Sequence, residues 1–227
     1  MCVRYTLHNL DTVLAAIARA LGCSLSSPAA AKPRYNVTVT SEMPVVALEA
    51  GRPAAGMMRW GYAFGPAKAP LPNAKAETVA TLPTFRESAA RRRCLVPANG
   101  FYEWKDAGGV KLPHLFTLRD DEPFAFAGIW EPPGHDLPAT FCILTTSPNE
   151  VVAPIHNRMP VLLTAETMPR WIGDRPLAET ELKALTQPLP SARLRVRPVN
   201  RYVSNTRNEG PQCHAAPDEA PPEFAFG

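Results

Sequence analysis

Hydrophobic residues recur with helical spacing near the start of the chain, in the stretch "LHNLDTVLAAIARALG". Residues three or four positions apart lie on one face of an α-helix, so apolar residues at these steps predict a helix with one buried face. Asp11 is suited to cap the N-terminus of this helix and Gly22 to end it. The pattern therefore predicts a helix over residues 11–21. Its buried face would consist of Val13, Leu14, Ile17 and Leu21.

Most of the remaining chain consists of short apolar runs separated by turn residues, which is the pattern of β-strands. Helical patterns return near the end, at residues 165–172, where Pro169 is expected to break the helix, and at residues 177–186. One helix, many short strands and two late helices predict an α+β fold with largely antiparallel sheets. The predicted strands cover residues 45–50, 57–63, 93–98, 100–105, 114–118, 123–130, 140–147, 158–163 and 193–199.

The length and composition indicate a single domain. The chain has 227 residues, of which 26 are proline, and a high proline content favours short strands and turns over long helices. The sequence contains no internal repeat and no linker-like segment. We therefore expect one domain over residues 1–213, followed by a Pro-rich C-terminal tail over residues 214–227.

The charge, cysteine and histidine patterns argue against several classes of function. The formal net charge of +3 is too small to indicate a polyanion partner by itself. The 5 cysteines and 5 histidines show no C-x-x-C or H-E-x-x-H motif, so we expect no structural disulfide, no metal site and no cofactor. Cys23, Cys94 and Cys142 are expected to be small core residues. The absence of a signal-peptide pattern and of a long apolar run predicts a cytoplasmic protein.

Four short blocks place polar residues among apolar and aromatic ones. Each residue has an ordinary structural interpretation, because an asparagine after proline is commonly a turn residue, a strand glutamate commonly faces solvent and a histidine before a turn is commonly structural. Taken singly, none of them indicates chemistry. The blocks are Cys2 with Arg4, "LPNAKAET" with Asn73, "GFYEWK" with Glu103, and "PIHNRMP" with His156 and Arg158.

Taken together, these blocks occur in an order that resembles the SOS-response-associated peptidase (SRAP) family. The family's M-C-G-R, N-A-R-x-E-T, G-F-Y-E-W and I-H-x-R-M-P blocks match residues 1–4, 73–78, 100–104 and 155–160. Supporting matches are "RYN", "MRWGY", "AGIWEPP", "TTS" and "VSNTRN", and the resemblance extends over residues 2–213. It implies the SRAP fold, in which strongly bent sheets form a barrel-like core with flanking helices.

Proteins of this family crosslink to abasic sites in single-stranded DNA, and the resemblance implies the same activity here. It also implies a monomer that associates with the nucleoid when it is bound to DNA. An N-terminal cysteine offers an amine and a thiol, with ordinary pKa values of about 8 and about 8.5, which together can close a thiazolidine ring on an aldehyde. Only Cys2 can do this, and only after Met1 is removed.

The resemblance assigns roles to the other residues of the blocks. Asn73 would orient the attack, Glu103 would transfer protons, and His156 would assist opening of the deoxyribose ring. Arg4, Lys75 and Arg158 would contact phosphates. Trp60 and Trp104 would shape the site or stack on bases. The expected catalytic residues are Cys2, Asn73, Glu103 and His156, and the expected DNA-binding residues are Arg4, Trp60, Lys75, Trp104, Thr145 and Arg158.

Three positions depart from the family pattern. Val3 replaces a glycine beside the nucleophile, Lys75 replaces an arginine, and Val39 stands where the family has a proline that wedges against bases. Two arginine clusters compensate for the small net charge: Arg193, Arg195 and Arg197 on one strand face, and the three residues of 91–93. Each cluster is equally well explained as a solvated edge that resists aggregation.

Two alternatives to abasic-site crosslinking remain open from the sequence. The first is a cysteine peptidase or N-terminal-nucleophile amidohydrolase that uses Cys2 on an amide, including the one that follows Met1. The second is a non-catalytic module for single-stranded DNA in which Cys2 has no chemical role. An amide substrate would not require DNA, and a binding module would tolerate the loss of Cys2.

Overall fold

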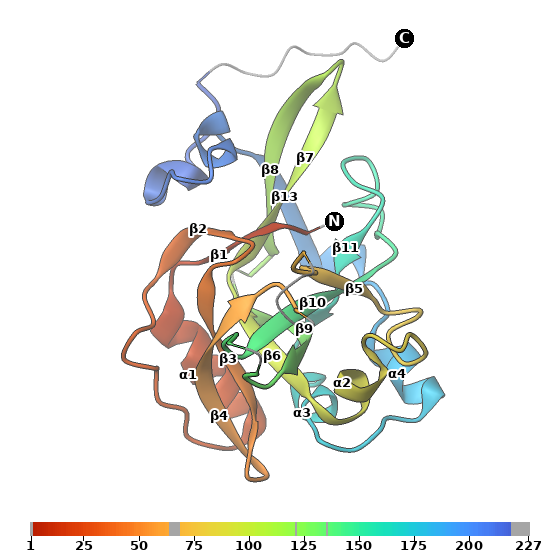
Figure 1. Ribbon diagram of the computed structural model, residues 1–227. Coiled ribbons are helices and arrows are strands. Elements are labelled where there is room, and N and C mark those ends of the chain that lie inside the picture. Colours follow the sequence, from red (N-terminus) through yellow and green to blue (C-terminus); the bar gives the residue numbers. More distant parts are fainter. Residues whose placement is uncertain (1, 64–68, 121, 135, 219–227) are drawn as a thin grey trace.

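A ring of β-strands forms the core of the protein, and a second sheet packs against it (Figure 1). The computed structural model describes residues 2–63, 69–120, 122–134 and 136–218. The ring strands, in spatial order, are β10 (Thr140–Thr146), β4 (Arg52–Trp60), β3 (Glu42–Glu49), β6 (Arg93–Ala98) and β9 (Phe124–Glu131). Because β10 pairs with β4 on one side and with β9 on the other, the ring closes.

Short strands extend the ring at β10 and β9, and the second sheet carries the start of the chain. β5 (Asn73–Lys75) and β11 (Met159–Pro160) pair with β10, and β12 (Leu162–Leu163) pairs with β9. The second sheet has the order β13 (Leu194–Pro198), β8 (Val110–Leu118), β7 (Gly100–Ala107), β1 (Arg4–Leu7) and β2 (Arg34–Thr38). All pairings are antiparallel except those of β10 with β4 and β5. The predicted α+β fold with bent, mainly antiparallel sheets is thus confirmed.

The helices lie outside the ring. The described α-helices are α1 (Leu10–Leu21), α2 (Arg86–Arg91), α3 (Met168–Trp171) and α4 (Glu179–Leu185), and 3-10 helices cover Ser191–Arg193, Arg201–Ser204 and Pro211–His214. The predicted helix over 11–21 is confirmed, and Gly22 ends it in the left-handed conformation at φ 63°. Asp11 lies within the first turn, so its assignment as the N-cap is wrong: Asn9 holds that position.

Other local expectations need correction. Pro169 does not break a helix, because it lies in the first turn of α3, where its missing N–H leaves no hydrogen bond unmade. The strand predicted over 57–63 ends at Trp60. Cys94 and Cys142 are buried in the core as expected, whereas Cys23 is partly exposed after α1. Residues 219–227 of the predicted tail lie outside the described residues.

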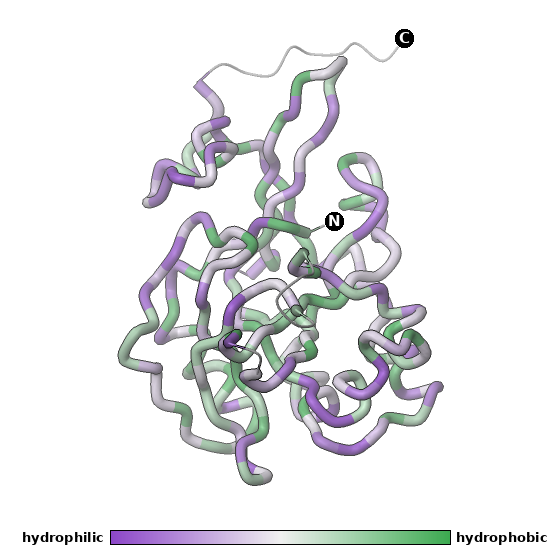
Figure 2. Tube along the Cα trace, viewed as in Figure 1, coloured by the Kyte–Doolittle hydropathy of each residue, from purple (hydrophilic) through white to green (hydrophobic). Residues whose placement is uncertain are grey.

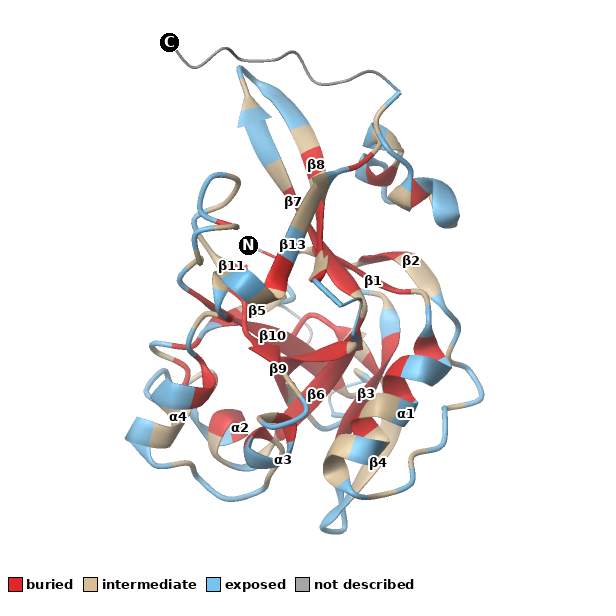
Figure 3. Ribbon diagram, turned by 180° about the vertical axis from the view of Figure 1, so that it is seen from behind, coloured by how far each residue is buried: buried red, intermediate tan, exposed pale blue. Residues whose placement is uncertain are grey.

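Residues of the ring are more buried than residues of the segments that project from it. The strands of the ring and the start of the chain are mainly buried, whereas the far end of the β7–β8 hairpin is exposed (Figure 3). Hydrophobic stretches run through the ring strands, while the segment after β13 is mainly hydrophilic (Figure 2). Among the described helices, none has the length and apolar character needed to cross a membrane.

Candidate active site

The pairing of β1 with β7 brings the start of the chain beside the "GFYEW" block. Tyr5 is opposite Phe101, and Thr6 is opposite Gly100. Continued toward the N-terminus, this antiparallel register places residues 2 and 3 alongside Glu103. Figures 1 and 3 also show that β1 begins close to β5 and β11. Three blocks that are far apart in the sequence therefore meet at the start of β1.

Cys2 lies just before β1, where these three blocks meet. Its side chain is fully buried, and its thiol donates a long hydrogen bond of 3.8 Å to the carbonyl oxygen of Arg4. Burial, reinforced by the negative charge of Glu103, raises the pKa of the thiol far above its ordinary value. The thiol is therefore protonated at neutral pH in this arrangement.

Glu103 is buried, which contradicts its interpretation as a solvated strand residue. Only 3% of its surface is exposed, and it shares the inward face of β7 with Phe101. Burial raises the pKa of its carboxyl from 4.5 to about 7, because the charged form loses its hydration. A carboxyl with a pKa near neutrality can both accept and release a proton at physiological pH.

His156 faces this carboxyl from the turn before β11. Its Nε2 atom is 4.0 Å from an oxygen of Glu103. The Nδ1 atom of His156 lies 3.0 Å from the backbone N–H and 3.1 Å from the carbonyl oxygen of Arg158, so either tautomer of the neutral ring has a partner there. Burial lowers the pKa of His156, which favours the neutral imidazole. The pair thus combines a carboxyl whose pKa is raised to about 7 with an imidazole that is held mainly neutral.

Asn73 enters the site from β5, the strand that pairs with β10. Its side-chain amide donates to the carbonyl oxygen of Pro72 at 3.0 Å, and the indole N–H of Trp60 donates to the same oxygen at 3.0 Å. The Oδ1 atom of Asn73 is buried and has no hydrogen-bond partner among the described residues. A buried acceptor without a donor is costly, so this atom is suited to receive an N–H or O–H from a bound group.

The residues expected to bind DNA are divided between exposed and buried positions. Lys75 is exposed at the end of β5, and Trp104 is partly exposed with its indole N–H bound to the hydroxyl of Ser204. Trp60 is fully buried, so its ring presents no face to a base and only its site-shaping role fits the structure. Thr145 is 2% exposed, and its hydroxyl points to the carbonyl oxygen of Ala74.

Arg4 and Arg158 are already engaged by protein groups. The guanidinium of Arg4 is buried, donates to Asn36 and to the carbonyl oxygen of Val203 at 2.8 Å each, and lies 5.4 Å from the ring of Trp104. Arg158 donates to both carboxylate oxygens of Glu77, at 2.6 Å and 2.8 Å. Glu77 lies inside a block recognised from the sequence, but its own role was not predicted, because only the fold shows which cation it meets.

The two arginine clusters differ in their surroundings. Arg93 is buried and donates to the carbonyl oxygens of Ala89 and Trp171, and Arg92 pairs with Glu87 and Glu131. Residues 91–93 therefore do not form the open basic surface that the sequence allowed. Arg195 and Arg197 lie on the edge strand β13, where the alternating Leu194 and Val196 pack toward the core as predicted. Arg193 does not share their strand, because it ends the 3-10 helix that precedes β13 and pairs with Glu122.

Within residues 2–63, 69–120, 122–134 and 136–218, no three histidine, cysteine, aspartate or glutamate side chains come close enough to hold a metal ion. The candidate site therefore consists of a buried thiol, a buried carboxyl, an imidazole and an amide. This combination suits proton transfer and attack on a carbonyl carbon.

Comparisons with known proteins agree with the order of the sequence blocks. A family model described as "SOS response associated peptidase (SRAP)" matches residues 1–206. Abasic site processing protein YoqW from Bacillus subtilis (strain 168) is 34% identical over 190 residues, which are 79% of this chain and 84% of YoqW. Abasic site processing protein YedK from Escherichia coli (strain K12) is 32% identical over 155 residues, covering 66% of this chain and 70% of YedK.

A solved structure has a similar fold. The crystal structure of a protein from Bacteroides thetaiotaomicron superposes with a TM-score of 0.76 and covers 95% of this chain and 99% of that chain. At 21% sequence identity, this likeness concerns the fold alone.

Proposed function

Because the chain belongs to the SOS response associated peptidase (SRAP) family, we propose that it senses abasic sites in single-stranded DNA and crosslinks to them through Cys2. The observation that carries the proposal is the position of Cys2 beside the Glu103–His156 pair. The partner is therefore DNA, in keeping with the name of the similar abasic site processing protein YoqW. We further propose that the protein acts as a monomer.

The reaction joins the two nucleophiles of an N-terminal cysteine to one carbon. The α-amine of Cys2, freed by removal of Met1, adds to the aldehyde of the ring-opened abasic sugar and expels one water to give a Schiff base. The thiol then adds to the imine carbon: a carbon–sulfur bond forms, and the thiol proton passes to the nitrogen. Ring closure within one residue benefits from an effective molarity on the order of 10⁵ M when the geometry is right.

The buried carboxyl of Glu103 is placed to move the protons of both steps. A group with a pKa of about 7 can protonate the departing hydroxyl and afterwards take a proton from the amine or the thiol. His156, with its Nε2 atom toward Glu103, would assist opening of the sugar ring and relay protons to solvent. The free Oδ1 atom of Asn73 would accept a hydrogen bond from the amine of Cys2 and orient its lone pair.

Exposed cationic side chains would provide most of the contacts with the DNA backbone. Lys75 is accessible and follows Asn73 by two residues, so it would contact a phosphate next to the abasic sugar. Trp104 would support the strand with its exposed edge. Arg4 would contribute through the position of Trp104 more than through direct contact, because its guanidinium is buried.

The peptidase alternative receives less support from this geometry. Attack on an external amide would require a reactive thiolate, but burial keeps the thiol of Cys2 protonated. In the crosslinking reaction the amine attacks first, and the thiol closes the ring within the same residue. Cleavage of the bond after Met1 needs no external access, so self-processing remains part of the proposal. Met1 lies outside the described residues, and the intact mass of the purified protein would report whether it is removed.

The deciding experiment is a test for covalent capture. The protein without Met1 is incubated with a single-stranded oligonucleotide that contains one abasic site, denatured, and measured by intact mass. We expect a denaturation-resistant species whose mass equals protein plus oligonucleotide minus one water. An undamaged oligonucleotide of the same sequence should give none. No adduct with the abasic oligonucleotide, despite a free Cys2 amine, would overturn the proposal.

A further inference from the structure

We propose that Glu77 is a resident counter-ion that occupies the phosphate-binding face of Arg158 and is displaced when DNA binds. This inference rests on the proposed function, since it concerns how the same site accepts single-stranded DNA. It gives a role to a residue that neither the sequence blocks nor the comparisons assign. The partner that displaces Glu77 is a phosphate of the DNA backbone.

The contacts of Arg158 show that its guanidinium is already satisfied. Its two Nη atoms donate to the two oxygens of Glu77 at 2.6 Å and 2.8 Å, and one of them also donates to the carbonyl oxygen of Thr145 at 2.6 Å. The paired geometry with two carboxylate oxygens is the one that a guanidinium also offers to two phosphate oxygens. A phosphate can therefore bind these Nη atoms only after the carboxylate of Glu77 has moved away.

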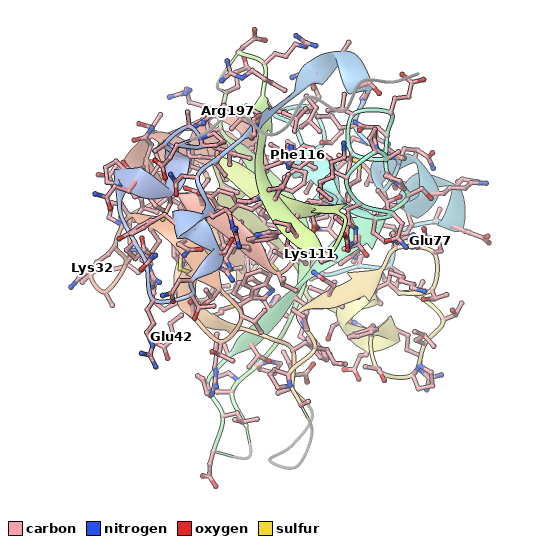
Figure 4. All side chains as sticks on the ribbon, turned by 90° about the horizontal axis from the view of Figure 1, so that it is seen from above. Lys32, Glu42, Glu77, Lys111, Phe116 and Arg197 are labelled. Atoms are coloured by element: carbon pink, nitrogen blue, oxygen red, sulfur yellow. The ribbon has the colours of Figure 1, made fainter. Side chains whose placement is uncertain are left out.

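The surroundings of the pair make such an exchange feasible. The side chain of Glu77 is 47% exposed, whereas that of Arg158 is 18% exposed. The carboxylate thus occupies the solvent side of the guanidinium, and Figure 4 shows Glu77 at the outer side of the molecule. Since the contact with Thr145 is to a backbone oxygen of β10, Arg158 stays anchored when the carboxylate swings out.

The backbone of Arg158 also belongs to the catalytic turn. Its N–H donates to Nδ1 of His156, and His156 faces Glu103. The side chain of Arg158, at the same position, is within reach of a phosphate that flanks the reacting sugar. The hydrogen bonds of Arg158 lower the pKa of Glu77, so the carboxylate stays ionised at neutral pH and competes fully with the phosphate.

The replacement of Glu77 by a phosphate at Arg158 affects how strongly DNA binding depends on the salt concentration. A phosphate that binds Arg158 releases its condensed cation, but the displaced carboxylate of Glu77 regains one, so the contact contributes little net counter-ion release. Without the carboxylate charge, the same contact would add one released counter-ion. That addition would increase the magnitude of the log–log salt slope for single-stranded DNA by about 0.7.

The test measures non-covalent binding of an undamaged single-stranded oligonucleotide by the full chain, so it does not depend on the crosslinking reaction. Glu77→Gln keeps the size and one acceptor but removes the charge. We expect it to bind about fivefold more tightly at low salt, the scale of one partly exposed ion pair. The slope magnitude should rise by about 0.7. Both gains should disappear when Arg158→Ala is added.

The control is Glu49→Gln, which removes the same charge from the exposed end of β3, opposite Arg52 of β4. It should leave affinity and slope unchanged. Unchanged or weaker binding by Glu77→Gln, or a gain that persists in the Arg158→Ala background, would overturn the exchange while leaving the proposed function intact. If the wild-type protein does not bind single-stranded DNA at all, the proposed function and this inference fall together.

Discussion

The Nε2 atom of His156 lies 4.0 Å from a carboxylate oxygen of Glu103, although the two residues are 53 positions apart in the sequence. Glu103 comes from the inward face of β7, and His156 comes from the turn that leads into β11. A carboxyl whose pKa is raised to about 7 and an imidazole whose lowered pKa favours its neutral form thus meet beside the buried Cys2.

Replacement of Glu103 by Gln should slow the chemistry without weakening DNA binding. Gln keeps the shape but cannot transfer a proton, and general acid–base groups contribute about 10²–10⁴ in rate. We expect adduct formation and reversal to slow by at least about tenfold, a lower bound that lies beneath that range. Quenched time courses at saturating abasic DNA would measure both rates. Wild-type rates in both directions would show that Glu103 transfers no rate-determining proton.

The buried carboxyl of Glu103 should also make stability depend on pH. Its pKa is raised from 4.5 to about 7, so the folded protein holds this proton more tightly than the unfolded chain does. The stabilising contribution of the protonated carboxyl is therefore complete below about pH 4.5 and is lost as the pH rises through 7. Relative to Glu103→Gln, the wild type should lose up to about 3 kcal/mol between pH 4.5 and 8, measured by urea denaturation. A pH-independent difference would contradict the raised pKa.

The thiol and the amine of Cys2 should be separable by mutation. Cys2→Ser and Cys2→Ala keep the α-amine, so each should form a Schiff base that borohydride traps. Neither can close the sulfur-containing ring, and the unreduced product should dissociate on denaturation. Intact mass before and after reduction would distinguish the two products. A variant that gives as much stable adduct as the wild type would exclude the thiol as the ring-closing atom.

Lys75→Ala should weaken binding more than chemistry. Loss of one phosphate contact should lower the magnitude of the salt slope for single-stranded DNA by about 0.7. The adduct yield should recover at high DNA concentration, because Lys75 is exposed and makes no contact with Glu103 or His156 among the described contacts. Lys32→Ala, at an exposed position before β2, is the matched control. A defect that persists at saturating DNA would place Lys75 in the chemistry.

Arg4→Lys should destabilise the fold more than it weakens DNA binding. The buried guanidinium donates to Asn36 and to the carbonyl oxygen of Val203, and a lysine cannot satisfy both with the same geometry. We expect a loss of about 1–3 kcal/mol in the free energy of unfolding. Arg52→Lys, at the exposed start of β4, should be neutral. A wild-type stability combined with a lower salt slope would instead make Arg4 a direct phosphate contact.

Local patterns determined much of the fold. The strand predicted over residues 93–98 coincides with β6, and Gly22 ends α1 as expected, because hydrophobic periodicity and glycine conformation act within a few residues. The short strands β1, β2 and β5 were not predicted. Each is only three to five residues long, and each forms because a distant partner strand supplies its hydrogen bonds.

The residue types of the candidate site were also readable from the sequence, since Cys2, Asn73, Glu103 and His156 stand in recognisable blocks. The protonation states of these residues could not be read from the sequence. Whether Glu103 faces water or the core depends on which face of β7 meets the ring, and its raised pKa follows from that burial. The meeting of Glu77 with Arg158 likewise joins residues 81 positions apart. A sequence specifies which groups are present, but solvation and distance determine their protonation and partners, and only the tertiary structure sets those.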